Sequence, residues 1–155
     1  MLRISKLADY GTVVMVNLSK QGDKLSSARC IAEQTRLTLP TVSKILKQLT
    51  AADLLVSVRG ANGGYKLSRS PEAITVAQII YALEDQRGLT ECSVHAGECS
   101  LQGHCAIQGN WRLISNAIET ALDSVTLAEF AKPKLRDSQL SHIKQLVSGE
   151  NCGGW

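Results

Sequence analysis

The sequence has few aromatic residues and no long hydrophobic run. Aromatic side chains make up 4% of the 155 residues, so the core must be aliphatic. No apolar stretch approaches the roughly 18 residues of a membrane-spanning helix. The N-terminus also lacks the basic, apolar and small-residue regions of a signal peptide. With 44% hydrophobic and 20% charged residues, the composition is that of a folded globular protein, and we expect a cytoplasmic protein without membrane contact.

The five cysteines are not expected to form disulfides, because their number is odd and thiols stay reduced in the cytoplasm. Three of them, Cys92, Cys99 and Cys105, lie within fourteen residues. Such a cluster in a cytoplasmic protein indicates metal binding or redox chemistry. We interpret Cys30 as a small core residue and Cys152 as a thiol of the C-terminal tail.

Positive charge is concentrated in the first half of the chain, although the net charge is only +3. Residues 1–88 hold 12 Lys and Arg against 7 Asp and Glu, whereas residues 89–155 hold 5 against 7. Six basic residues and one acid, Asp53, lie within 36–69. A local basic patch indicates a polyanionic partner, with a merely solvated face as the alternative.

The apolar spacing of the first half predicts three helices followed by a β-hairpin. Ser5 is a suitable N-cap for the first helix, Ser26 or Ser27 for the second, and Pro40 suits the first position of the third. Two strand-like runs, 54–58 and 65–67, flank a turn rich in Gly and Asn. This order predicts a mainly α fold in which residues 1–87 form a winged helix-turn-helix domain with a small β-hairpin wing.

The second half predicts a fourth helix over 75–85, a loop containing the cysteines over 88–105, and a long helix near 105–124. Apolar residues of the long helix recur at intervals of 4, 3, 4, 3 and 4. We interpret this stripe as a homodimer seam within a dimerisation segment, 106–131, with burial inside one chain as the alternative. Residues 132–155 are expected to be a partly disordered extension with a weak helix over 138–147. The stripe consists of Ile107, Trp111, Ile114, Ile118, Ala121 and Val125.

The predicted domain type indicates which residues meet DNA. The second helix of a helix-turn-helix enters the major groove N-terminus first, so residues at its start contact base edges. We expect Lys47, one turn further on, to contact a phosphate, and Arg59, in the wing, to enter a minor groove. A homodimer would read a palindromic operator in double-stranded DNA, with half-sites about 34 Å apart. The base-edge candidates are Pro40, Thr41, Ser43 and Lys44.

The cysteine spacing is Cys92-x6-Cys99-x5-Cys105. Structural zinc commonly has four ligands paired at Cys-x2–4-Cys spacing, and neither interval here matches. Three thiolates in a wide, glycine-containing loop can hold an iron–sulfur cluster, although spacing alone leaves zinc equally open. A fourth ligand of another type would then be needed. The local candidates are His95, His104 and Gln108.

Taken together, the motif Val58–Tyr65, the three-cysteine loop and Trp111 resemble the Rrf2 family of winged-helix regulators. That family includes the iron–sulfur regulator IscR and the nitric-oxide sensor NsrR. The resemblance covers about residues 1–131, and residues 1–15 are most similar to the branch that regulates the SUF iron–sulfur assembly operon. It implies that the three clustered cysteines ligate an iron–sulfur cluster, with 2Fe–2S preferred and 4Fe–4S possible.

The resemblance also implies that Asp9 supplies a carboxylate ligand from the partner subunit. Where IscR-like members have a ligand histidine, this chain has Gln108, so the fourth ligand stays open between Asp9 of the partner and His104. The other interpretation of Asp9 is an exposed first-turn carboxylate favoured by the helix dipole.

The sequence therefore favours a homodimeric repressor whose DNA affinity depends on an iron–sulfur cluster, and we expect cluster binding to order 88–105. A nitric-oxide or redox sensor of the same fold is one alternative, and a zinc-stapled DNA-binding module without sensing is another. An enzyme with a small-molecule substrate is disfavoured, because no Cys–His–acid set is in place.

Overall fold

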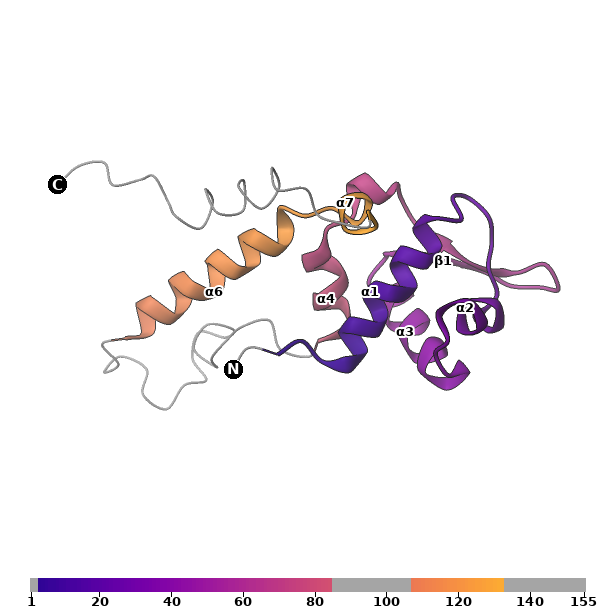
Figure 1. The fold of residues 1–155 in the computed structure, drawn as a ribbon, viewed down its shortest axis with the longest axis horizontal. Helices are drawn as coiled ribbons and strands as arrows, with labels where there is room; N and C mark the ends of the chain where they lie inside the picture. The colour runs from indigo at the N-terminus through magenta and orange to yellow at the C-terminus, as the bar shows by residue number, and fades with distance from the viewer. Residues whose placement is uncertain (1–2, 85–106, 133–155) are drawn as a thin grey trace.

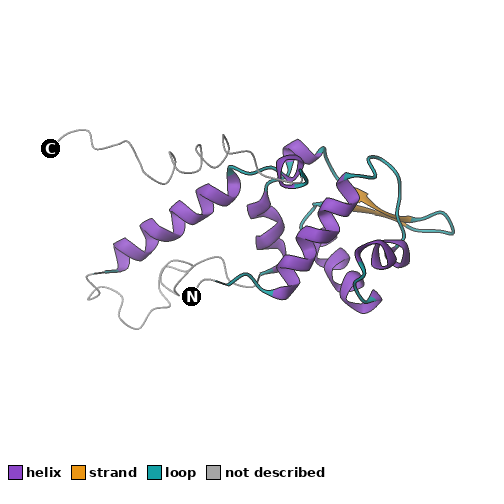
Figure 2. Ribbon diagram, viewed as in Figure 1, coloured by secondary structure: helices purple, strands orange, loops and turns teal. Residues whose placement is uncertain are grey.

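The structure is a computed structural model that describes residues 3–84 and 107–132. Helices dominate it, and one two-stranded antiparallel sheet lies at one end (Figures 1 and 2). No helix in these two ranges is both long and apolar enough to cross a membrane. In chain order the elements are α1 (Lys6–Ser19), α2 (Ala28–Thr35), α3 (Leu39–Ala51), β1 (Leu55–Val58), β2 (Gly64–Leu67), the 3-10 helix η1 (Pro71–Ala73), α4 (Val76–Leu83), α6 (Gln108–Asp123) and α7 (Leu127–Phe130).

Side-chain caps fix the starts of three helices. The hydroxyl of Ser5 accepts a hydrogen bond from the Ala8 N–H at 3.1 Å, and that of Ser27 accepts one from the Cys30 N–H at 3.2 Å. Ser27, not Ser26, therefore opens the second helix. Thr75 and Gln78 form a reciprocal capping box at the start of α4. The fourth helix is shorter than predicted, because it ends at Leu83 and Glu84 is already extended.

The hairpin β1–β2 confirms the predicted wing. Leu55 pairs with Leu67 and Val58 with Gly64, so the strands begin and end within one residue of the expected runs. Ser26 forms a β-bridge to Tyr65, with backbone hydrogen bonds of 3.0 and 2.9 Å. This bridge ties the wing to the start of α2.

One aliphatic core joins the helices, as the scarcity of aromatic residues predicts. Helices α1, α3 and α4 pack against one another, and α4 also packs against α6 (Figure 1). A Cβ atom placed on Gly11 of α1 would overlap the Leu83 Cδ1 of α4, so any larger residue at this position would require the Leu83 side chain to move. The largest fully buried side chains are Met15, Leu18, Ile31, Ile45, Leu46, Leu49, Leu54, Ile74, Ile79, Leu127, Val14 and Val42.

The long helix α6 begins at Gln108, later than predicted, and extends away from the other helices (Figure 1). Its C-terminal end is anchored. The Val76 N–H donates to the Val125 carbonyl at 2.9 Å, and the Leu127 N–H donates to the Ile74 carbonyl at 2.8 Å. Helix α7, which the sequence analysis did not predict, follows at once with its own capping box from Thr126.

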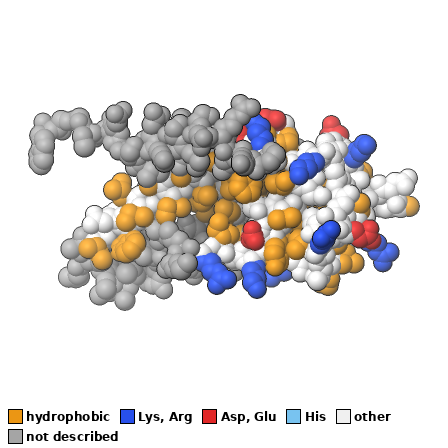
Figure 3. Space-filling model, viewed as in Figure 1, with side chains coloured by type: hydrophobic (Ala, Val, Ile, Leu, Met, Phe, Trp, Pro, Cys, Tyr) orange, Lys and Arg blue, Asp and Glu red, His pale blue; other side chains and the backbone are white. Residues whose placement is uncertain are grey.

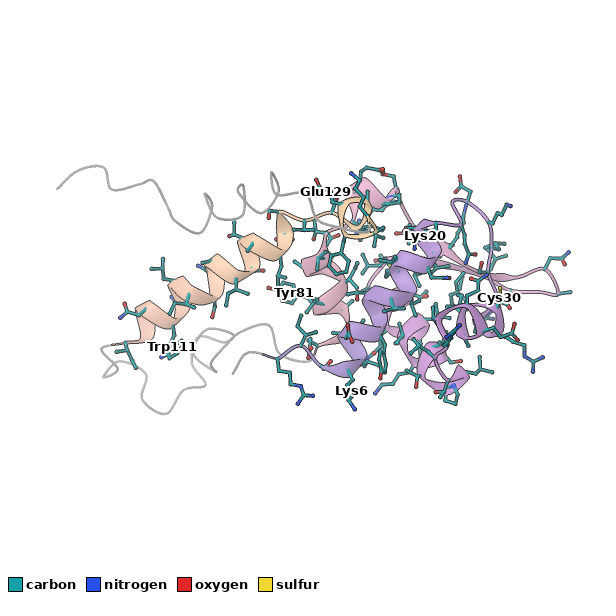
Figure 4. The ribbon with its side chains drawn as sticks, in the orientation of Figure 1. Lys6, Lys20, Cys30, Tyr81, Trp111 and Glu129 are labelled. Carbon is teal, nitrogen blue, oxygen red and sulfur yellow. The ribbon has the colours of Figure 1, made fainter. Side chains whose placement is uncertain are left out.

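The apolar stripe of the long helix divides into two parts. Val125 is buried and Ile118 is half-buried, so intramolecular burial is right for the C-terminal end. Ile107, Trp111 and Ile114 remain exposed, by 54%, 38% and 44%. Figure 4 shows Trp111 at the far end of α6, away from the remaining helices. Within the described chain, nothing covers this half of the stripe, which stays the predicted homodimer seam.

Candidate nucleic-acid interface and cysteine segment

Helix α3 presents two opposite faces. Its apolar side chains Val42, Ile45, Leu46 and Leu49 have no exposed surface. The residues predicted to meet DNA lie on the other face. Pro40, Ser43, Lys44 and Lys47 are all exposed, and their spacing of 3, 1 and 3 residues places them along one side of the helix, whereas Thr41 is half-buried beside them.

The first turn of α3 differs from the prediction in two details. Pro40 is the second helical residue rather than the first, because the helix begins at Leu39. Thr38, the N-cap, was not among the predicted site residues. Its hydroxyl makes no cap hydrogen bond and instead pairs with the Thr41 hydroxyl at 2.8 Å. A threonine directly before a proline-containing first turn is the signal that could have identified it.

The angle between α2 and α3 is set at Arg36. This residue closes α2 in the left-handed conformation with φ 58°, and its N–H donates to the carbonyls of Ala32 and Glu33. The chain then leaves α2 through Leu37, which packs half-buried against the core. After this short connection, the residues at the N-terminus of α3, Thr38 to Pro40, are exposed.

The wing carries Arg59 at its exposed tip. Gly60 adopts φ 117°, which favours glycine, and a Cβ atom on Gly63 would overlap the Val58 carbonyl oxygen. Lys66 on β2 lies 3.4 Å from the Asp23 carboxylate, so part of its charge is offset. Figure 3 shows Lys and Arg side chains interspersed with Asp and Glu side chains on the face of the molecule seen in that view. The cations best placed for a polyanion are therefore those of α3 and the wing tip.

Asp9 lies exposed in the first turn of α1. Its backbone carbonyl accepts the Thr12 hydroxyl at 2.7 Å, and within residues 3–84 and 107–132 its carboxylate has no hydrogen-bonding partner. An exposed carboxylate at this position suits both interpretations: a ligand offered to a second subunit, and a first-turn acid favoured by the helix dipole. Both stay predictions.

The predicted cluster ligands Cys92, Cys99, Cys105 and His104 lie outside the described residues. The part of the chain that is described holds no group of three potential metal ligands. Cys30 lies on α2 (Figure 4) and is half-buried, so it is more exposed than the core residue that the sequence predicts at this position.

The cysteine segment, residues 85–106, connects α4 to α6. It leaves the C-terminal end of α4 after Glu84 and rejoins the chain before Ile107, at the start of α6. The Ser5 N–H donates to the Glu84 Oε1 at 2.8 Å, which ties this boundary to the N-terminus of α1. Since α4 also packs on α3, the segment adjoins the helix that supports the recognition face.

Three helices, an αL turn before an outward-facing third helix, and a hairpin wing define a winged-helix DNA-binding regulator. The sequence model of the Rrf2 family, described as an iron-dependent transcriptional regulator, matches residues 4–133. The chain belongs to the Rrf2 family. Its similarity to named relatives concerns transcriptional regulators rather than enzymes.

Two relatives and two solved structures show how far the similarity extends. CymR of Bacillus subtilis is 32% identical, over 84% of this chain and 90% of its own. IscR of Vibrio cholerae is 28% identical, over 97% and 90%. The structure of CymR, the global cysteine regulator of B. subtilis, aligns with TM-score 0.66 at 33% identity, over 84% of this chain and 97% of its own. That of T. potens IscR aligns with TM-score 0.65 at 32% identity, over 90% of each chain.

Proposed function

We propose that this protein is a homodimeric, cytoplasmic repressor whose affinity for operator DNA depends on an iron–sulfur cluster held by Cys92, Cys99 and Cys105. The observation that carries the proposal is where these cysteines lie. Their segment connects α4, which packs against the recognition helix α3, to α6, which carries the exposed apolar stripe. By resemblance of residues 1–15, the target is the SUF assembly operon.

The donor set fits an iron–sulfur cluster. Thiolates are the usual protein ligands of such clusters, and the intervals of six and five residues exceed those of structural zinc knuckles. Asp9 of the partner subunit or His104 would complete the ligand set. The bound cluster would be 2Fe–2S or, alternatively, 4Fe–4S. It would act as a sensor because it is lost when the iron concentration falls or when an oxidant attacks it.

The chain has a direct route from this segment to the DNA-binding face. Glu84, the residue before the segment, is hydrogen-bonded to the start of α1, and Leu83 fills the space above Gly11. A constraint on residues 85–106 therefore acts on α4 at its contact with α1. Through α6, the same constraint acts on the proposed dimer contact. Together these contacts would fix the spacing of the two α3 helices.

The proposed DNA contacts follow from the exposed faces. Thr41, Ser43 and Lys44, with Pro40 packing beside them, would meet base edges in the major groove, and Lys47 would bind a phosphate. Arg59 would enter the adjacent minor groove, whose negative potential attracts a guanidinium group. Because a homodimer repeats this arrangement, the operator would be palindromic.

The test is an anaerobic titration of fluorescent operator DNA with the protein before and after cluster removal. Iron-loaded protein is expected to show a different Kd from the stripped protein, and equal values would refute the proposal. Cys30→Ala serves as a matched control, because it removes a thiol outside the cysteine segment and should keep both iron and the cluster-dependent Kd.

Two alternatives give different results in the same preparation. A zinc-stapled module would be colourless and free of iron after anaerobic purification. A nitric-oxide sensor would lose its visible absorbance on exposure to nitric oxide but keep it under mild iron chelation.

A further inference from the structure

The recognition helix begins with an exposed leucine that the core does not use. Leu39 is 41% exposed, whereas the branched aliphatic side chains further along α3, Val42, Ile45, Leu46 and Leu49, have no exposed surface. Leu37, two residues earlier, packs against the core. The core and the residues packed against it therefore include positions on both sides, Leu37 and Val42, but not Leu39, whose side chain is partly exposed to solvent.

The helix geometry gives that side chain a direction. In an α-helix each Cα–Cβ bond tilts toward the N-terminus, so the side chain of the first residue extends past the end of the helix. A recognition helix enters the major groove N-terminus first. Leu39 is therefore the apolar group of α3 that would reach furthest toward the bases.

The neighbours of Leu39 are polar or small. The Thr38 and Thr41 hydroxyls are hydrogen-bonded to each other, with 2.8 Å between their Oγ1 atoms. Pro40 and Ser43 are exposed beside them. Hydroxyl groups pair with several base edges and discriminate weakly. The apolar group that B-DNA displays in the major groove is the C5-methyl of thymine.

We propose that Leu39 is a specificity-determining residue that packs on the C5-methyl group of one thymine in each half-site. This inference rests on the proposed DNA-binding function and adds to it a preference for T·A at one position. The leucine excludes water from the methyl group, while the flanking hydroxyls and Lys44 make the polar contacts.

The test uses an operator selected in vitro from random duplexes by the iron-loaded protein. Each thymine is replaced in turn by deoxyuridine, which removes only the methyl group, and Kd is measured by fluorescence anisotropy. For the wild type, one replacement per half-site is expected to weaken binding about fourfold, which is what burial of one methyl group is worth. For Leu39→Ala, the same replacement should have no effect, whereas Leu39→Met should keep the sensitivity.

Val13→Ala is the matched control, because Val13 is a similarly exposed aliphatic residue, at 43%, on α1. It should leave the deoxyuridine profile unchanged. Wild-type binding that tolerates every deoxyuridine would overturn the inference while DNA binding itself stands, and so would a methyl effect that persists in Leu39→Ala. If no duplex is enriched, the proposed function is what fails.

Discussion

The Ser5 N–H donates a hydrogen bond to the Glu84 Oε1 at 2.8 Å, across 79 positions of sequence. Ser5 is the N-cap of α1, and Glu84 is the C-cap residue directly after α4. The bond thus joins the first turn of α1, where Asp9 lies, to the boundary of the cysteine segment.

Glu84→Ala should lower the free energy of unfolding by about 1 kcal/mol, because it leaves the Ser5 N–H without its acceptor. Urea denaturation followed by circular dichroism measures this loss. Glu84→Gln keeps an acceptor oxygen and should recover most of the stability. Equal losses in the two variants would show that the hydrogen bond is not the cause.

Gly11→Ala should destabilise the protein by about 1–3 kcal/mol, because the new methyl group overlaps the buried Leu83 side chain. Pairing it with Leu83→Ala should cost less than the sum of the two single changes, since the second change makes room for the first. Gly109→Ala on α6 is the control, as a Cβ atom there meets nothing within 4 Å. It should leave the denaturation midpoint unchanged or raise it.

Arg59→Ala should weaken binding chiefly at A/T-rich minor-groove positions of the operator, because a narrow minor groove attracts the guanidinium group most strongly. Kd values for operators that differ only at those positions measure the effect. An equal loss on every sequence would mean that Arg59 contacts a phosphate. Arg29→Ala, an exposed arginine on α2, provides a comparison of the same charge change.

Cys99→Ala should abolish the visible chromophore and the bound iron of anaerobically prepared protein, because two thiolates remain where three are needed. The variant should stay a folded dimer by light scattering. Full iron content in this variant would remove Cys99 from the ligand set.

Ile114→Glu should convert the dimer to a monomer, because it places a charge in the middle of the exposed apolar stripe of α6. Light scattering gives the mass, and affinity for a palindromic duplex should fall with it. Asn116→Glu adds the same charge on the other side of α6, where the residue is exposed, and should leave the dimer intact. A dimeric Ile114→Glu variant would place the seam elsewhere.

The local elements were predictable because their signals are short-range. Ser5 and Thr75 are capping residues whose hydroxyls meet N–H groups three positions away, and the glycines of the turn at 59–64 permit the hairpin. The burial of Val42 and the exposure of Ser43 follow from helix periodicity alone. All of these depend on neighbours within about one turn of chain.

Other features depend on partners distant in sequence. Nothing near Gly11 indicates that Leu83 will lie against it, and the choice between Ser26 and Ser27 as the cap was decided by the bridge from Ser26 to Tyr65. The split of the α6 stripe, buried at Val125 and exposed at Trp111, likewise depends on where α4 and α7 pack.

By itself, the sequence determined the order of the helices, the wing, the exposed face of α3 and the spacing of three cysteines, since periodicity, capping and turn chemistry act locally. Only the tertiary structure decided that α1 and α4 approach at Gly11, that Glu84 is tied to Ser5, and that Leu39 is left outside the core. Those relationships arise because the helices pack around one aliphatic core. This packing brings together residues that are far apart in sequence, and local sequence patterns do not indicate such contacts.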